Sequence, residues 1–439
     1  MARRFSFQVA AFRPLARLGP AGWLLALMPL LALAGCASAP RAYVEPPPLA
    51  ATERPAHNLE VFERARELVD EKYFDPAFRG RDWRALGARY RPLAAAARDD
   101  AALYRVLNDL CGELGESHLV AIPPRRTHER KTDLRFGVGM GWRRLEANQV
   151  VTELVPGGPA EAAGVEVGWI IVSRNGVPLD QLAGTPPPRP GEPVTYGFLD
   201  LENQPRSIVF APQLLRYERL EARDLPGGFR YLRFDRFDRE SLRWLGAQLK
   251  AFPDAPGVVI DLRDNLGGTI YACQAAVNQF FPDRVSSGRF VRRGGAAHES
   301  KGWSFFGADY RGRVLILTSG ATGSAAEIFA HVLQFRGRAT VVGRPTAGAV
   351  ILSRTYALPG GGSLQVPIQD YRGLDGRRLE GHGVMPDVPL AVPVVADLRA
   401  GRDSDLSAAL TLLRTKDPRN IASAARQPAR EAFADTVLD

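Results

Sequence analysis

The sequence predicts an α/β core that follows an N-terminal helical domain and a glycine-rich β module. Strand–turn–helix units recur across residues 213–395, as expected for packed α/β layers. Apolar residues recur at helical spacing in residues 56–130, and glycine turns separate short β-type runs in residues 131–212. A chain of 439 residues has room for all three units.

The composition is that of an ordinary globular protein, with 45% hydrophobic and 24% charged residues. The formal net charge is +9, but four arginines fall within the first 22 residues, and the rest of the chain has no dense basic run. Nucleic acid is therefore not expected as a partner.

The N-terminus is predicted to be a targeting signal. Arginines precede the apolar stretch Trp23–Leu33, which is shorter than the ~20 residues of a membrane-spanning helix. The ending Leu33-Ala34-Gly35-Cys36 is similar to a bacterial lipobox, in which the cysteine is acylated. We therefore expect residues 1–36 to be a lipoprotein signal peptide, with a lipid anchor at Cys36. The alternative is an ordinary signal peptide cleaved near Ala37 to Ala39.

A Pro/Ala-rich segment, residues 37–55, is expected to be a tether. By resemblance to Gram-negative lipoproteins, alanine at position 37 favours the outer membrane, with the protein facing the periplasm. In an oxidising periplasm Cys111 and Cys273 could pair, and the alternative is two buried thiols. Neither has metal-ligand spacing to a histidine, so no metal is expected.

Residues 56–130 are expected to form helices, interrupted at Asp75-Pro76 and Arg91-Pro92. The helices lead into the turn Gly115-Glu116-Ser117-His118. This turn holds a histidine beside a serine, and His118 is the candidate base for a nucleophile elsewhere in the chain.

Residues 131–212 combine a strand at Gln149–Val155, a short helix after Gly158, and a second strand that ends in an Asn175-Gly176 turn. In this order the signals resemble a bacterial PDZ domain. The resemblance implies that the loop Gly137, Val138, Gly139 and Met140 binds the terminal carboxylate of a peptide through backbone N–H groups. A plain glycine turn is the alternative.

Ser324 is the candidate nucleophile, because it lies where the apolar run Val314–Leu317 gives way to a helix. A serine needs a base to act as a nucleophile. The spacing Ser324-x-x-Glu327 also fits a capping box, so a purely structural N-cap is the alternative. Three backbone N–H groups are candidate donors to an oxyanion, those of Gly267, Gly268 and Ala325.

Four motifs follow the PDZ-like module in order: Asp261-Leu262-Arg263-Asp264-Asn265-Leu266-Gly267-Gly268, Gly323-Ser324-Ala325-Ala326-Glu327, Val342-Gly343-Arg344-Pro345-Thr346-Ala347-Gly348 and Gly383-Val384-Met385-Pro386-Asp387. With the module they resemble the C-terminal processing (tail-specific) and tricorn-type serine peptidase superfamily, over roughly residues 57–395. The resemblance implies a ClpP/crotonase-like α/β core and no cofactor.

The base separates two branches of this superfamily. The processing branch uses a lysine, but the matching position is Ala349, and no lysine occurs between Lys301 and Lys416. The tricorn-like branch uses Ser, His, Ser and Glu, and the matching residues here are Ser117, His118, Ser324 and Glu380. The resemblance thus implies that His118 is the general base and that Ser117 and Glu380 orient it.

Other histidines compete with His118 less well. His382 lies in the Glu380 loop and is the alternative base, whereas His331 is expected to pack or to face solvent. His118, Ser117 and Glu380 each have a structural alternative, as a turn histidine, a local cap and a surface carboxylate.

The expected function is a serine endopeptidase of the bacterial cell envelope, which captures polypeptide substrates by their C-termini and is anchored to the membrane at Cys36. The sequence leaves the oligomeric state open and shows no chemistry in the tail, residues 396–439. One alternative is an inactive PDZ-containing scaffold, and another is a hydrolase of non-peptide esters or amides.

Overall fold

The computed structural model describes residues 43–181, 191–217, 219–302 and 310–415. The predicted signal peptide with Cys36 lies outside these residues, as do the start of the predicted tether and the end of the predicted tail. Within the described ranges, no helix is both long and apolar enough to cross a membrane.

The helical region consists of α2 (Arg54–Lys72), η1 (Phe78–Gly80), α3 (Trp83–Ala95), α4 (Asp100–Gly112) and α5 (Pro124–Thr132). Asp82 and Asp99 cap α3 and α4 by accepting backbone N–H groups of the first turn. Pro76 lies between α2 and α3, as expected. The break expected at Pro92 was wrong, because Pro92 lies in the last turn of α3 and costs the helix only one backbone hydrogen bond.

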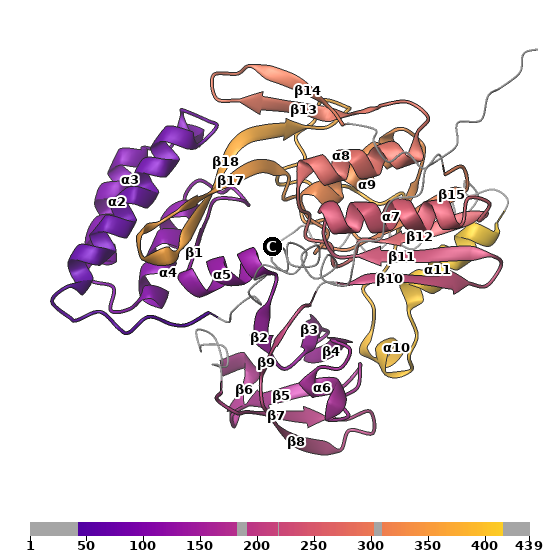
Figure 1. The fold of residues 1–439 in the computed structure, drawn as a ribbon, viewed down its shortest axis with the longest axis horizontal. Helices are drawn as coiled ribbons and strands as arrows, with labels where there is room; N and C mark the ends of the chain where they lie inside the picture. Colours follow the sequence, from indigo (N-terminus) through magenta and orange to yellow (C-terminus); the bar gives the residue numbers. More distant parts are fainter. Residues whose placement is uncertain (1–42, 182–190, 218, 303–309, 416–439) are drawn as a thin grey trace, which may run out of the picture. The chain divides into compact units, whose positions relative to one another are not determined.

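These helices share their core with the C-terminal half of the chain. Side chains of α2, α3 and α4 pack against Leu358, Leu364 and Val366. The short strand β1 (Val120–Ile122) pairs antiparallel with β18 (Ser363–Arg372). This pairing brings the turn that precedes β1, with Ser117 and His118, to the C-terminal half of the chain (Figure 1).

The sheet that receives β1 has the strand order β1-β18-β13-β14, and β17 also pairs with β18. Its remaining strands are β13 (Ser286–Arg292), β14 (Ala297–Lys301) and β17 (Ile351–Ala357). All of these pairings are antiparallel.

The glycine-rich module forms a sheet of order β3-β4-β5-β7-β8, to which β6 adds beside β5. Its elements are β3 (Met140–Leu145), β4 (Asn148–Leu154), α6 (Pro159–Ala162), β5 (Ile170–Arg174), β6 (Val177–Pro178), η2 (Leu179–Gln181), β7 (Val194–Leu199) and β8 (Pro205–Phe210). The predicted strands and short helix are confirmed. Asn175 and Gly176 both have positive φ, as an Asn-Gly hairpin turn requires.

The chain enters the module through β2 (Arg135–Gly137) and leaves it through β9 (Gln213–Leu215), and these two strands pair with each other.

The α/β core is a sheet of order β10-β11-β12-β15-β16-β19. Its strands are β10 (Leu220–Leu225), β11 (Phe229–Phe234), β12 (Gly257–Asp261), β15 (Arg313–Thr318), β16 (Thr340–Gly343) and β19 (Val388–Pro389). Only the β10–β11 pairing is antiparallel. The predicted strands at 257, 314 and 340 are confirmed.

Helices cover both faces of this sheet (Figure 1). On one face lie α7 (Arg239–Ala251), α8 (Ile270–Val277) with η3 (Asn278–Phe280), and α9 (Ala325–Phe335). On the other face lies α11 (Ser404–Arg414). The boundary expected after residue 395 falls inside α10 (Val395–Arg399), and α11 belongs to the core because Leu406, Leu412 and Leu413 are buried against the sheet.

Candidate active site

Three loops meet at one edge of the α/β sheet. They follow the parallel strands β12, β15 and β16, whose carboxyl ends lie at the same edge, the usual site of ligand binding in such sheets. Hydrogen bonds tie the loops together: Gly323 N–H donates to Asn265 O at 3.0 Å, and Ala347 N–H donates to Thr322 O at 2.9 Å. The fold therefore places these three turns, and Ser324 with them, in one cluster.

Ser324 sits at the junction of β15 and α9 in a strained backbone conformation. Its φ and ψ are 54° and −120°. An ordinary N-cap residue has β-region angles, and a non-glycine residue at this φ persists only where the surroundings enforce it. The predicted capping box is present, since Glu327 accepts the Ser324 N–H. A capping box alone does not account for this strain, which is typical of a nucleophile presented on a sharp strand-to-helix turn.

Glu327 enforces the Ser324 conformation from the first turn of α9. Its side chain is 0% exposed and accepts the N–H groups of Ser324, Gly348 and Ala349 at 2.9, 2.8 and 2.9 Å. Thr346 Oγ1 donates to the same carboxylate at 2.5 Å. Burial raises the pKa of Glu327, and these donors oppose that shift. The sequence signals only its capping role, so the anchoring of the 346–349 loop was missed.

Ser117, His118 and Glu380 come together across 262 or more residues of sequence. Ser117 Oγ lies 2.7 Å from His118 Nδ1. Glu380 is 4% exposed, and its carboxylate accepts Ser117 N–H at 2.8 Å and Val350 N–H at 2.6 Å. Glu380 is thus a buried carboxylate and not a surface one, and it contacts the backbone of Ser117, not the His118 ring.

The environment of His118 favours the neutral imidazole. Burial lowers the pKa of His118, the nearby Glu380 carboxylate raises it, and Arg130 lowers it, with a net downward shift. With Nδ1 bonded to Ser117, the other ring nitrogen, Nε2, remains for a proton transfer. A neutral imidazole near pH 7 is the form that a general base requires.

The backbone of Ala349 and Val350 links this cluster to Ser324. Ser324 N–H donates to Ala349 O at 2.9 Å, and the next N–H along, that of Val350, donates to Glu380. Among the described residues, no hydrogen bond joins His118 to Ser324. Catalytic hydrogen bonds are often long without substrate, so the lack of this hydrogen bond does not by itself exclude His118 as the base.

Two of the three predicted oxyanion donors keep a free N–H. In the described part of the chain, Gly268 N and Ala325 N have no hydrogen-bond partner. The prediction for Gly267 was wrong, because its N–H donates to Asn265 Oδ1 at 2.9 Å. Gly267 has another role: a Cβ there would lie 2.5 Å from Ser324 Cβ, so only glycine lets this loop approach Ser324.

Two of the other histidines and both internal cysteines have the following surroundings. His331 is buried, and its Nε2 accepts Leu374 N–H at 3.1 Å, which matches the packing expected for it. His382 Nδ1 lies 3.1 Å from Glu380 O within its own loop. Cys111 and Cys273 are both buried and unpaired, so the buried-thiol alternative is the correct one.

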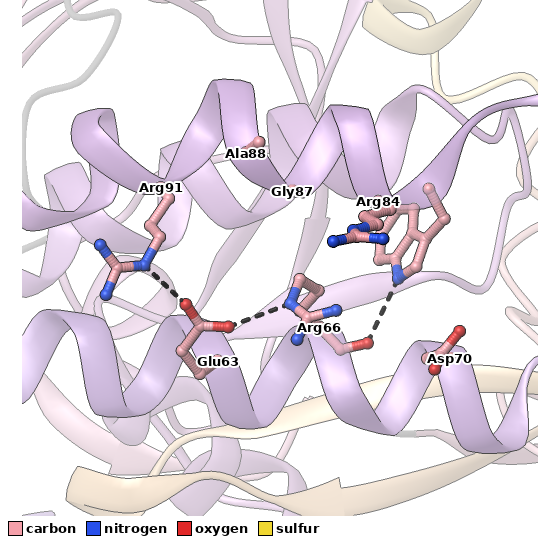
Figure 2. A pocket seen from close by; sticks show the side chains of 8 residues that line it. Glu63, Arg66, Asp70, Arg84, Gly87, Ala88 and Arg91 are labelled. Carbon is pink, nitrogen blue, oxygen red and sulfur yellow. Dashed lines mark hydrogen bonds and ion pairs between the residues drawn. The ribbon is translucent and has the colours of Figure 1, made fainter.

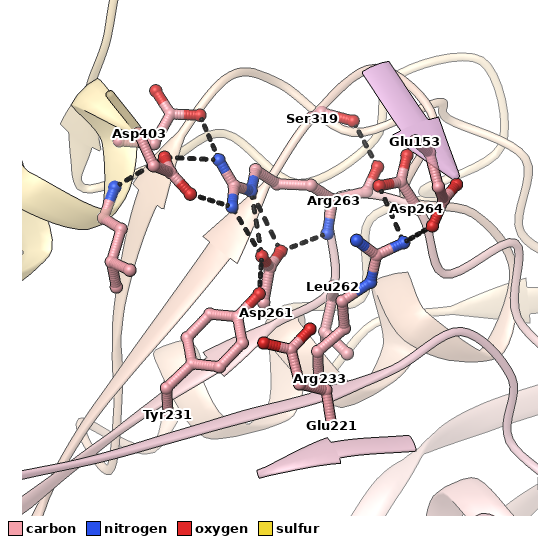
Figure 3. Close-up of polar contacts among 12 residues, drawn as sticks. Glu153, Glu221, Tyr231, Arg233, Asp261, Leu262, Arg263, Asp264, Ser319 and Asp403 are labelled. Atoms are coloured by element: carbon pink, nitrogen blue, oxygen red, sulfur yellow. Dashed lines mark hydrogen bonds and ion pairs between the residues drawn. The ribbon is translucent and has the colours of Figure 1, made fainter. Parts of the chain in front are cut away.

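Ion pairs hold the loop that carries Gly267 and Gly268 (Figure 3). Arg263 contacts Asp261 at 2.6 Å and Asp403 at 2.7 Å. Asp405 of α11 is 1% exposed and bridges Arg263, at 3.1 Å, to Arg344 of the neighbouring loop, at 2.6 Å. Burial opposes ionisation of Asp261, but Arg263 outweighs it and lowers the Asp261 pKa to about 2.

The same loop contacts the β module. Asp264 pairs with Arg143 of β3 and lies 3.2 Å from Arg233 of β11, which also contacts Glu153 of β4 at 2.8 Å (Figure 3). The loop that carries Gly267 and Gly268 therefore touches both the core sheet and the module expected to bind peptides.

The predicted carboxylate-binding loop lies between β2 and β3. Val138 and Met140 bury their side chains in the module core, and Val138 O accepts Ala160 N–H at 2.8 Å. Gly139 has a φ of 79° and donates its N–H to the Tyr217 hydroxyl at 3.1 Å. Tyr217 had no part in the sequence predictions.

A hollow of about 380 Å³ lies apart from these residues, between the neighbouring helices α2 and α3 (Figure 2). Glu63 accepts from Arg66 at 3.0 Å and from Arg91 at 2.8 Å, so its charges are paired. The described residues contain no cluster of metal-ligand side chains.

Comparison with protein families matches two parts of the chain. Residues 229–390 match peptidase family S41, and residues 54–112 match the tricorn protease C1 domain. The first match contains the three loops and Glu380, and the second contains α2, α3 and α4.

Individual relatives agree with these matches. The carboxyl-terminal-processing protease of Synechocystis is 26% identical over 367 residues, which cover 79% of this chain and 84% of that protein. A Streptomyces coelicolor protein named as a tricorn protease homolog is 24% identical over 411 residues, which cover 86% of this chain but 34% of that protein.

Among solved structures, the photosystem II D1 C-terminal processing protease has a TM-score of 0.53 at 22% identity. The aligned region covers 82% of this chain and 98% of that one. At this identity the likeness concerns the fold.

Proposed function

We propose that the protein is a serine endopeptidase whose nucleophile is Ser324, because residues 229–390 match peptidase family S41. The strained backbone of Ser324, at φ 54°, is the observation that carries this proposal. Strain of this kind is held at functional sites, and here Glu327 and the Ala349 carbonyl hold it.

His118 acts as the general base. Its Nε2 takes the proton of Ser324 Oγ as that oxygen attacks the peptide carbonyl, and the same proton then passes to the leaving amine. The acyl-enzyme is hydrolysed when His118 removes a proton from water and returns it to Ser324. Ser117 fixes the imidazole through the 2.7 Å contact, and the charge of Glu380 stabilises the imidazolium.

The N–H groups of Gly268 and Ala325 stabilise the oxyanion of the tetrahedral intermediate. Each donor of this kind contributes about 2.7–4 kcal/mol to acyl-transfer transition states. Gly267 supports them by allowing the loop to lie against Ser324.

The β module is proposed to be a PDZ domain that captures substrate C-termini. Strand β3 ends its sheet, so a peptide can add beside it as a further strand. The loop that precedes β3 then meets the terminal carboxylate. The ion pairs of Asp264 provide contact between this module and the oxyanion loop.

The protein is proposed to be a periplasm-facing lipoprotein, anchored through Cys36, most simply at the outer membrane. The lipobox-like ending at residues 33–36 supports this location. Labelled palmitate should be incorporated by the full chain expressed in a Gram-negative host and should be absent from Cys36→Ala.

A fluorophosphonate probe tests the nucleophile, because it reacts with activated serines. We expect labelling of the intact protein, none of Ser324→Ala, and a strong loss in His118→Ala, together with loss of cleavage of a fluorescein-labelled unfolded protein. Labelling and cleavage that survive unchanged in His118→Ala would refute the proposed base.

An inactive PDZ scaffold is the second candidate function. The absence of a direct His118–Ser324 hydrogen bond within the described residues favours it. An intact protein that binds C-terminal peptides but takes up no probe would establish the scaffold, whereas probe labelling with ester but not peptide cleavage would indicate a non-peptide hydrolase.

A further inference from the structure

Tyr217 lies where the chain leaves the β module. It follows β9, which pairs antiparallel with β2 so that Gln213 stands opposite Gly137. This pairing carries Tyr217 back alongside the loop of Gly137, Val138, Gly139 and Met140.

The Tyr217 hydroxyl occupies the loop. It accepts the Gly139 N–H at 3.1 Å, and a Cβ added at Gly137 would collide with the same hydroxyl oxygen. The Arg135 guanidinium lies 5.6 Å from the centre of the Tyr217 ring. One phenol therefore fills the space beside both glycines and stacks against the nearest cation on β2.

The rest of the loop is held in place. Val138 O accepts Ala160 N–H at 2.8 Å, and Gly139 O accepts Val155 N–H at 2.8 Å. The carbonyl groups of Val138 and Gly139 therefore face the module, and the Gly139 N–H donates to the Tyr217 hydroxyl. A peptide that extends the sheet at β3 brings its terminal carboxylate to this donor.

We propose that Tyr217 is an internal competitor for the substrate carboxylate, so that a peptide binds only if its C-terminus displaces the Tyr217 hydroxyl from Gly139. This inference rests on the proposed PDZ function. It makes Tyr217 a residue that sets both the affinity and the carboxylate specificity of the site.

The competition favours a charged ligand. Burial raises the pKa of Tyr217, so the competitor is a neutral phenol. A carboxylate forms hydrogen bonds roughly twice as strong as a neutral acceptor, and it can also pair with Arg135 once the ring moves. An amidated or internal peptide segment has neither advantage and leaves Tyr217 in place.

The test uses the full chain with Ser324→Ala, which prevents cleavage. Decapeptides randomised at the last four positions, with free or amidated C-termini, identify a binder, whose affinity is measured by fluorescence anisotropy. Tyr217→Phe keeps the ring and removes the hydroxyl. It should bind the free-carboxylate peptide about fivefold more tightly, the factor to which a hydrogen bond of about 1 kcal/mol corresponds.

Tyr196→Phe is the matched control, because Tyr196 is buried in the core of the same module and should leave the affinity unchanged. If Tyr217→Phe binds equally or more weakly while the parent still prefers the free carboxylate, Tyr217 is not a competitor and only this inference is overturned. If neither protein distinguishes free from amidated peptides, the PDZ proposal fails and this inference fails with it.

Discussion

Replacement of Glu380 by glutamine tests how the proposed histidine relay is held in place. The carboxylate accepts two backbone N–H groups, from Ser117 at 2.8 Å and from Val350 at 2.6 Å. Glutamine has one acceptor oxygen and one NH2 group. In either orientation of the amide, one of the two backbone donors therefore faces another donor.

The expected cost follows from these contacts. A hydrogen bond to a charged group contributes about 1.5–3 kcal/mol. If that amount is lost from the transition state, kcat/KM falls by about tenfold to 150-fold, at 1.36 kcal/mol per tenfold. The carboxylate also stabilises the His118 cation, so the loss should appear mainly in kcat.

The pH profile gives a second readout with a definite sign. Burial lowers the pKa of His118, and Glu380 opposes that shift by raising it. Without the carboxylate the His118 pKa falls further. Because the base must be neutral, the acid limb of kcat/KM should move to lower pH while the plateau drops.

The assay is cleavage of a fluorogenic peptide at pH values across the acid limb. Asp370→Asn is the matched control, since Asp370 is also buried and pairs with Arg378 at 2.8 Å but is not among the groups that shift the His118 pKa. A change of kcat/KM below twofold in Glu380→Gln, or an acid limb that moves to higher pH, would refute the reasoning.

Two further predictions concern stability. Asp405→Ala removes a buried carboxylate that bridges two arginines and should lower the free energy of unfolding by about 3–5 kcal/mol in urea titrations. Asp397→Ala breaks a more exposed ion pair, with Arg402, and should lower the free energy of unfolding by less than about 1 kcal/mol. Equal losses in the two variants would contradict the bridging role of Asp405. Burial lowers the pKa of His331, so the unfolded chain takes up a proton near pH 6.5 before the native one does, and stability should fall as pH drops below that value. His331→Gln should flatten this dependence between pH 7.5 and 5.5, and an unchanged slope would count against it.

Local signals predicted most elements of the fold. Apolar runs bounded by glycine turns located β12, β15 and β16, because such strands are buried on both faces and hydrophobic throughout. Pro92 led to a wrong prediction of a helix break. A proline in the last turn of a helix removes a single hydrogen bond, and the buried Ala94 beyond it still packs. The place of α11 in the core was missed because most of its partners lie on strands far earlier in the chain.

The site was predictable only where residue type alone indicates chemistry. Ser324, His118 and Glu380 have side chains suited to their proposed roles, and the sequence motifs around them identified them as candidates. Which N–H groups are free depends on tertiary hydrogen bonds, and the Asn265 side chain removed Gly267 from the donors. Tyr217 gives no signal, because its significance comes from a hydroxyl that reaches a loop 78 residues earlier.

The backbone of Ala349 is tied to the candidate nucleophile. Both of its backbone groups are in use: its carbonyl accepts the Ser324 N–H at 2.9 Å, and its N–H donates to Glu327 at 2.9 Å. These bonds require no particular side chain, so position 349 can hold alanine without moving Ser324. The adjacent N–H, that of Val350, binds Glu380, which also fixes the Ser117 backbone. One short backbone segment therefore positions the proposed nucleophile and the proposed histidine relay together. Ala349→Lys should leave the Ser324 backbone in place. It should restore activity to His118→Ala only if the lysine reaches Ser324 Oγ as a neutral amine.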